Sequence, residues 1–102
     1  AEPVVKPVVS TEGKIITYKG KPIKVPYFSQ SAGRTLSARE VWGWQDTPYL
    51  VSVDDSHCGK SIRLGHGVGI SGCGAEVLAQ QGKDFEEIIK YYLKGVEVEK
   101  LL

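Results

Sequence analysis

The segment from Leu64 to Ala75 contains five glycines and one histidine, His66, directly before a stretch with helical spacing. Glycine loses much conformational entropy on folding, so such a density is tolerated where the backbone turns tightly or approaches a ligand closely. A polar loop that leads into a helix also presents unpaired backbone N–H groups, which suit an anionic or hydroxyl-rich ligand. The segment therefore predicts either a ligand-binding loop or a glycine-rich connector with a surface histidine.

The remaining sequence predicts an α+β fold with a small, mostly antiparallel sheet, a C-terminal helical hairpin and a returning final strand. Residues 14–18 and 23–28 have strand composition and flank a turn over 19–22, which predicts an antiparallel pair. Pro26 indicates that the second strand lies at an edge or contains a bulge. Residues 48–53 predict a further strand.

Capping patterns predict the helices. Ser37 and Glu40 have the spacing of a capping box, and they open a short helix. A second helix is expected to begin near the end of the glycine-rich segment and to stop at Gly82. Asp84 caps a third helix with a clear apolar face, and alternation over 96–101 predicts the final strand.

Size and charge limit the possible functions. With 102 residues, the chain is expected to form a single domain over 1–102, in which 1–10 extend along a sheet edge. The net charge of +1 and the scattered lysines do not indicate a nucleic-acid partner. No apolar run approaches the roughly 20 residues that cross a bilayer, and the first residues lack the pattern of a signal peptide.

A series of short motifs carries a family resemblance. In chain order these include Tyr18-x-Gly20-Lys21-Pro22-Ile23, Ser31-x-Gly33-Arg34-Thr35, Pro48-Tyr49-Leu50-x-Ser52-Val53 and Gly65-His66-Gly67-Val68-Gly69-Ile70-Ser71. From about Thr11 to its end, the chain resembles the stage II sporulation protein D / LytB (SpoIID/LytB) family. The resemblance implies a bacterial, extracytoplasmic domain of the cell wall, periplasm or intermembrane space that acts on peptidoglycan.

Active members of this family are lytic transglycosylases that cleave glycan strands, and others enhance a wall amidase. The family's proposed catalytic glutamate lies in an N-terminal region that has no counterpart in this chain, which resembles the C-terminal part of the family domain. We therefore expect a glycan-binding part of a lytic transglycosylase, with no catalytic residue of its own. The alternative is a non-catalytic wall-binding module that enhances a cell-wall amidase as its partner.

Two polar loops are expected to form a groove for glycan strands. Arg34 presents a fork of donors suited to a carboxylate, although it could instead pair with an acidic neighbour and tie down its own loop. Trp44 could stack on a sugar ring. His66 could bind a sugar hydroxyl or brace the glycine-rich loop. The full set of expected binding residues is Ser29, Ser31, Arg34, Thr35, Trp44, His66, Gly67 and Ser71.

The two cysteines leave three possibilities open. Cys58 and Cys73, together with His66, could bind zinc, although their spacing matches no compact zinc motif. A disulfide between the cysteines would stabilise the fold by roughly 3 kcal/mol outside the cytoplasm. Free thiols are the third possibility. No cofactor other than this zinc ion is expected.

Overall fold

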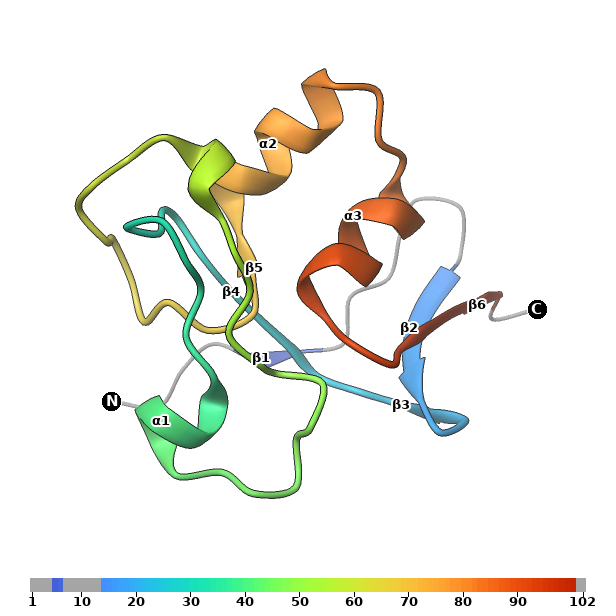
Figure 1. Ribbon diagram of the computed structural model, residues 1–102. Helices are drawn as coiled ribbons and strands as arrows, with labels where there is room; N and C mark the ends of the chain where they lie inside the picture. The colour runs from blue at the N-terminus through green and yellow to red at the C-terminus, as the bar shows by residue number, and fades with distance from the viewer. Residues whose placement is uncertain (1–4, 7–13, 101–102) are drawn as a thin grey trace.

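The computed structural model describes residues 5–6 and 14–100, and Figure 1 shows their arrangement. The strands are β1 (Val5–Lys6), β2 (Lys14–Tyr18), β3 (Lys21–Pro22), β4 (Val25–Phe28), β5 (Ile70–Ser71) and β6 (Glu97–Lys100). The helices are α1 (Ala38–Trp42), the 3-10 helix η1 (Ser56–Cys58), α2 (Gly72–Gln80) and α3 (Phe85–Tyr92). The α+β prediction is confirmed. Most of the segment 1–10, expected along a sheet edge, lies outside the described residues.

One sheet has the strand order β3-β2-β6 and is antiparallel throughout. The final strand returns as predicted, with Ile16 of β2 opposite Val98 of β6. Ile16 is fully buried, as are Tyr92 and Leu93, which lie just before this strand in the chain. All three side chains belong to the same buried core, so β2 and the end of α3 share one apolar interior.

The predicted pairing of 14–18 with 23–28 is wrong in its second half. Lys19 and Gly20 both have positive φ angles, of 51° and 80°, which suit a tight hairpin turn. Within the hairpin, β2 pairs only with the two-residue β3. The last backbone hydrogen bond runs from Ile23 N to Ile16 O at 3.1 Å. The chain then crosses to the second sheet, whose order is β1-β4-β5 (Figure 1).

Strand β4 is the middle strand of that second sheet, but Pro26 itself pairs on one side only, which fits the edge side of the predicted edge or bulge. β1 pairs antiparallel with Val25 and Pro26, whereas β5 pairs in parallel with Tyr27 and Phe28. The two neighbours thus bond different halves of β4. This arrangement lets a strand with one missing N–H group lie between two partners.

The strand predicted over 48–53 does not form. Its backbone instead binds the segment before α1, with Thr35 N donating to Val53 O at 2.8 Å and Ala38 N to Leu50 O at 3.1 Å. The N–H of Val53 donates to the Thr35 hydroxyl at 2.8 Å. A side chain has taken the place of a neighbouring strand, so no regular ladder develops.

The helix caps follow the sequence closely. Ser37 accepts from the backbone N–H of Glu40, and Gly43, with φ at 74°, ends α1. The Glu40 carboxylate binds Arg34 rather than closing the capping box. Asp84 and Glu87 form a complete box at α3. Within the described residues, the helices are too short and too polar for a transmembrane span.

The glycine-rich segment contains β5 and the start of α2. Gly69 has a φ of 89°, and a Cβ atom there would lie 2.1 Å from the carbonyl oxygen of Pro26. Backbone packing against β4 therefore requires glycine at this position. The buried core joins both sheets and the three α-helices: Ile16, Ile23, Val25, Ala38, Tyr49, Leu50, Val68, Leu78, Ile89, Tyr92, Leu93 and Val96.

Candidate functional site

Two of the expected binding residues, Ser31 and Ser71, lie fully buried beside an acid. The Ser31 hydroxyl donates to Asp55 Oδ2 at 2.5 Å, and the Tyr92 hydroxyl donates to Asp55 Oδ1, also at 2.5 Å. His57 Nε2 lies 3.2 Å from the same Oδ1 atom. We call Ser31, Asp55, His57 and Tyr92 the Asp55 cluster.

The Asp55 cluster joins four parts of the chain under the surface. Burial and the neighbouring Asp55 carboxylate raise the pKa of Tyr92, so the phenol remains a neutral donor. A Cβ atom on Gly74 would lie 2.0 Å from the Tyr92 hydroxyl and 2.1 Å from Asp55 Oδ1. The Ser71 hydroxyl accepts a hydrogen bond from the Gly74 N–H at 3.0 Å. Every carboxylate oxygen is bonded, so this cluster acts as a structural support.

Beside this cluster, Cys58 and Cys73 form a disulfide with a Cα–Cα distance of 5.3 Å. The bond ties η1 to the first turn of α2. Because both sulfur atoms are joined, neither is available as a thiolate, and the expected zinc set of Cys58, His66 and Cys73 does not form. In the described part of the chain, no group of three His, Cys, Asp or Glu side chains is arranged to hold a metal ion.

A cleft of about 640 Å³ runs along the disulfide. The expected binding residue Ser29 lies on it, together with the carboxylate of Glu76. Its other lining residues are Gln30, Cys58, Lys60, Gly72, Cys73, Val77 and Gln80. The lining contains no aromatic side chain, so this cleft has no platform for a sugar ring.

The Arg34 guanidinium is hydrogen-bonded to neighbouring groups of the protein. Its Nη1 atom donates to Glu40 at 3.1 Å, to the Ser52 hydroxyl at 2.9 Å and to the Thr35 carbonyl at 3.3 Å. Thr35 is fully buried, and its hydroxyl holds the Val53 backbone. These contacts match the alternative in which Arg34 fixes its loop. A ligand carboxylate would have to compete with Glu40 for the guanidinium.

His66 braces the glycine-rich loop, and it also supports an aromatic stack. Its Nδ1 accepts from the backbone N–H of Val68 at 3.0 Å. Burial lowers the pKa of His66, Arg63 lowers it further, and a hydrogen bond with the Tyr27 backbone offsets part of the shift. The imidazole is therefore held in its neutral form, with its ring 5.1 Å from that of Trp42.

This stack runs from the second sheet to the surface. Ring centroids lie 5.8 Å apart from Phe28 to His66 and 4.6 Å apart from Trp42 to Trp44. Trp44 is half-buried at the outer end. Aromatic pairs at these separations hold one another in place, so the Trp44 indole is a braced surface ring.

Arg34 and His66 do not meet in one groove. The two loops are adjacent, with Leu36 N donating to Gly67 O at 2.7 Å. However, Arg34 contacts Glu40, whereas His66 contacts Trp42, two positions later on α1. Residues two apart on a helix point to different sides, so the guanidinium and the imidazole reach α1 from different sides.

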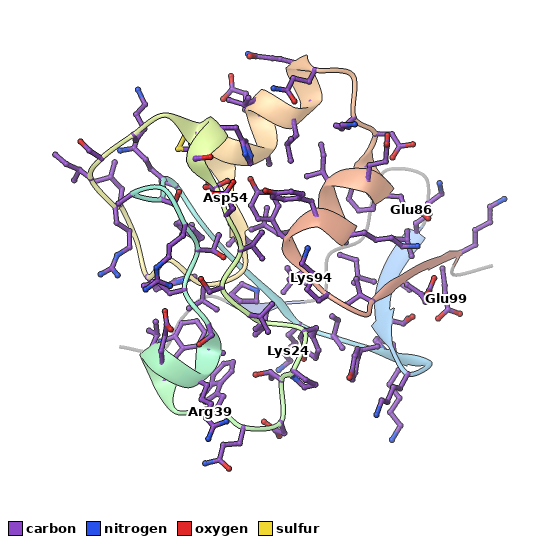
Figure 2. All side chains as sticks on the ribbon, viewed as in Figure 1. Lys24, Arg39, Asp54, Glu86, Lys94 and Glu99 are labelled. Atoms are coloured by element: carbon purple, nitrogen blue, oxygen red, sulfur yellow. A yellow bond between two sulfur atoms is a disulfide. The ribbon has the colours of Figure 1, made fainter. Side chains whose placement is uncertain are left out.

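A second cleft, of about 390 Å³, lies between α1 and the segment that follows it. Its lining residues are Ser37, Arg39, Trp44, Gln45, Thr47, Pro48, Leu50 and Val51, and we call it the Trp44 cleft. Figure 2 labels Arg39 at this end of the molecule, far from α2. A flat aromatic face beside hydroxyl, amide and guanidinium donors is an arrangement that suits a sugar.

Comparisons with known proteins agree with the motif order. No family model matches the sequence. Stage II sporulation protein D of Bacillus subtilis (strain 168) is 25% identical over 170 residues, which covers 89% of this chain and 49% of the relative. The Bacillus amyloliquefaciens protein of the same name gives the same figures. An amidase enhancer of B. subtilis is 37% identical over 51 residues, or 50% of this chain and 7% of the relative.

The SpoIID/LytB resemblance is confirmed. The chain spans about half the length of the stage II sporulation proteins that it matches. Their 170-residue alignment is longer than this 102-residue chain, so the SpoIID relatives contain segments without a counterpart here. This chain is thus shorter than the part of the SpoIID relatives to which it is similar.

The expected binding residues did not include three members of the Asp55 cluster or, apart from Trp44, any residue that lines the Trp44 cleft. Asp55 follows Asp54 in a short acidic run, and His57 directly precedes Cys58, so neither residue lies in a pattern that indicates a buried network. Tyr92 lies within the third predicted helix, and no neighbour in the sequence is an evident partner for its hydroxyl. Arg39 carried no signal beyond its charge. Gly74, a glycine inside a helix, was the one local sign of close packing in this region.

Proposed function

We propose that this SpoIID/LytB-like domain binds the glycan strands of peptidoglycan, outside the cytoplasm, in the Trp44 cleft. The observation that carries the proposal is the braced indole of Trp44 beside polar side chains in an open cleft. An indole presents a flat apolar face to the C–H face of a pyranose, and the surrounding donors can bind its hydroxyl groups. The disulfide supports an oxidising location.

Within a lytic transglycosylase, the domain would hold the strand while an acid outside this chain cleaves it. Glycan cleavage needs a carboxylic acid placed at the glycosidic oxygen. Asp55 is buried and bonded, Glu40 pairs with Arg34, and Glu87 closes the cap of α3. The Trp44 cleft is lined by no carboxylate. These arrangements favour binding over catalysis by the chain alone.

Pelleting with purified sacculi and with denuded glycan strands tests the proposal. We expect the chain to sediment with both and to release no anhydro-muramyl products. Trp44→Ala should lower the bound fraction several-fold. Tyr27→Ala is the matched control, because it removes an aromatic ring that is 48% exposed on β4, outside the cleft.

Failure of the wild-type chain to sediment with either material would refute the proposal. Release of anhydro-muramyl products would show instead that the chain is an enzyme by itself. In that case Glu76→Gln is the first variant to test, because Glu76 is the carboxylate that lines the cleft beside the disulfide.

The match to an amidase enhancer supports a second candidate, a module that stimulates a wall amidase. Stimulation is separable from binding. The chain should then speed the digestion of sacculi by a cell-wall amidase at concentrations where it does nothing alone. An unchanged digestion rate, with sedimentation intact, would leave glycan binding as the function.

A further inference from the structure

The loop between η1 and β5 carries the most exposed large apolar side chain in the described part of the chain. Residues 59–65 are all exposed, and we call them the Ile62 loop. Ile62 is 67% exposed and Leu64 is 51% exposed. The loop forms the left outline of the molecule in Figure 1, where it runs from η1 toward β5. One exposed leucine is ordinary, but two such side chains within three residues of a projecting loop are typical of an interaction site.

The backbone of the Ile62 loop is fixed from inside the protein. Leu64 N donates to Gln30 O at 2.8 Å, and Gln30 N donates to Leu64 O at 3.2 Å. The Gln30 side chain also donates to Ile62 O at 2.7 Å. At the end of the loop, a Cβ atom on Gly65 would lie 2.9 Å from Phe28 Cβ. The two apolar side chains are therefore held outside the core, so a partner that covers them pays little ordering entropy.

The charges of the Ile62 loop are all positive. Lys60 and Arg63 are exposed, and in the part of the chain that the structure describes neither has a hydrogen bond or an ion pair. Residues 59–65 contain no acid. Glu76 lines the cleft beside the disulfide together with Lys60, but the two do not pair. Two cations beside two apolar side chains are complementary to a surface that is both anionic and apolar beneath.

A lipid bilayer has this combination of properties. Peripheral membrane contacts combine apolar side chains buried at the headgroup boundary with cations attracted to anionic lipids. A protein partner matches the loop less well, because a stable protein interface covers about 800 Å² on each side. Two apolar side chains on a convex loop provide much less area than this, whereas a fluid bilayer needs no matching pocket.

We propose that the Ile62 loop docks this domain on an anionic phospholipid bilayer. Ile62 and Leu64 enter the headgroup boundary, and Lys60 and Arg63 lie at the lipid phosphates. The loop shares no residue with the Trp44 cleft, so this surface is separate from the proposed glycan site and does not depend on it. A domain with both surfaces would be held where the cell wall meets a membrane.

Flotation with phospholipid vesicles tests this proposal. The chain is mixed with vesicles of phosphatidylglycerol, which are anionic, or of phosphatidylcholine, which have no net charge. We expect about tenfold stronger binding to phosphatidylglycerol, because both loop cations then lie near a negative surface, and added salt should reduce this difference. Ile62→Ser should lower binding to phosphatidylglycerol about tenfold, since one apolar side chain no longer enters the bilayer.

Further variants assign the binding to the loop. Ile62→Trp should strengthen binding, because indole rings favour the bilayer interface, and its urea unfolding should match that of the wild-type chain. Lys60→Gln combined with Arg63→Gln should remove the preference for phosphatidylglycerol. Tyr27→Ser is the matched control and should bind like the wild type. Side chains alternate along a strand, so Tyr27 points to the face of β4 opposite to Phe28, which lies against the end of the loop.

The outcomes are distinct. No binding of the wild-type chain to phosphatidylglycerol vesicles would overturn the proposal, as would equal binding by the wild type and Ile62→Ser. A wild-type dimer in analytical ultracentrifugation that Ile62→Ser dissociates would assign the loop to a second copy of this chain instead. Sedimentation with sacculi should be unchanged in Ile62→Ser, so the membrane contact and glycan binding succeed or fail in separate assays.

Discussion

The Asp55 cluster and the Trp44 cleft are both rich in polar side chains, but they differ in whether those side chains have hydrogen-bond partners within the protein. In the cluster, the buried carboxylate accepts from Ser31 and Tyr92 and has His57 within 3.2 Å. In the cleft, the exposed Arg39 guanidinium has no hydrogen bond or ion pair among the described residues. Closed networks stabilise a fold, whereas open donors are available to a ligand.

The same contrast separates the residues expected to bind glycan. Ser31, Thr35 and Ser71 are fully buried, and their hydroxyls bond the protein itself. Arg34 and His66 are also engaged by protein groups. Trp44 alone lines the cleft on which the proposed function depends. Polar character in the sequence therefore does not show which of these side chains lack a partner within the protein.

Removing the central acid should give the largest effect. Asp55→Ala leaves the Ser31 and Tyr92 hydroxyls buried without their acceptor, so we expect a loss of about 3–5 kcal/mol in the free energy of unfolding. Urea unfolding followed by tryptophan fluorescence measures this loss. Asp54→Ala, the exposed neighbour, is the control and should change stability by less than about 0.5 kcal/mol. Similar losses in the two variants would show that the cluster is not the structural support.

Loss of the disulfide should give the next largest decrease in the free energy of unfolding, and it should leave glycan binding unchanged. Breaking the bond with Cys58→Ser and Cys73→Ser together should cost roughly 3 kcal/mol, as expected for a loop of this length. Urea unfolding of the double variant measures the cost. Folded double variant should still sediment with sacculi, because neither cysteine lines the Trp44 cleft. Loss of sedimentation by folded protein would place the glycan site at the disulfide instead.

A substitution in the Trp44 cleft should instead raise the free energy of unfolding. Thr47→Val replaces a shielded hydroxyl that has no partner among the described residues with a methyl group of similar size. We expect a gain of about 1 kcal/mol in unfolding free energy, because an unsatisfied buried group is costly. A lower free energy of unfolding in this variant would show that the Thr47 hydroxyl does have a partner in the folded chain.

The smallest effect concerns His66 and pH. Because burial lowers its pKa in the folded state, protonation favours the unfolded chain. The stability that neutral His66 contributes is complete above its unfolded pKa of about 6.5 and declines as the pH falls below that value. Urea unfolding at pH 7.5 and pH 5 should show a loss that is reduced in His66→Gln. An equal loss in the variant would assign the pH dependence to other groups.

Local features of this fold could be read from the sequence. The caps at Ser37 and Asp84 and the alternation that forms β6 depend on residues close together in the chain. The positions of these elements were therefore predictable. The second half of the first hairpin was not, because the choice of partner for β4 depends on β1 and on β5, which lies more than forty residues later.

The α+β class, the helical hairpin, the returning strand and the resemblance to SpoIID/LytB proteins all followed from local patterns and motif order in the chain. Which polar groups are internal and which are open became visible in the folded molecule alone. Asp54 and Asp55 are neighbours, yet one is exposed and the other fully buried. Arg34 and Arg39 have equal charges, yet only one is bound by an acid. The physical reason is that the partner of a polar side chain comes from distant segments, which only folding brings together.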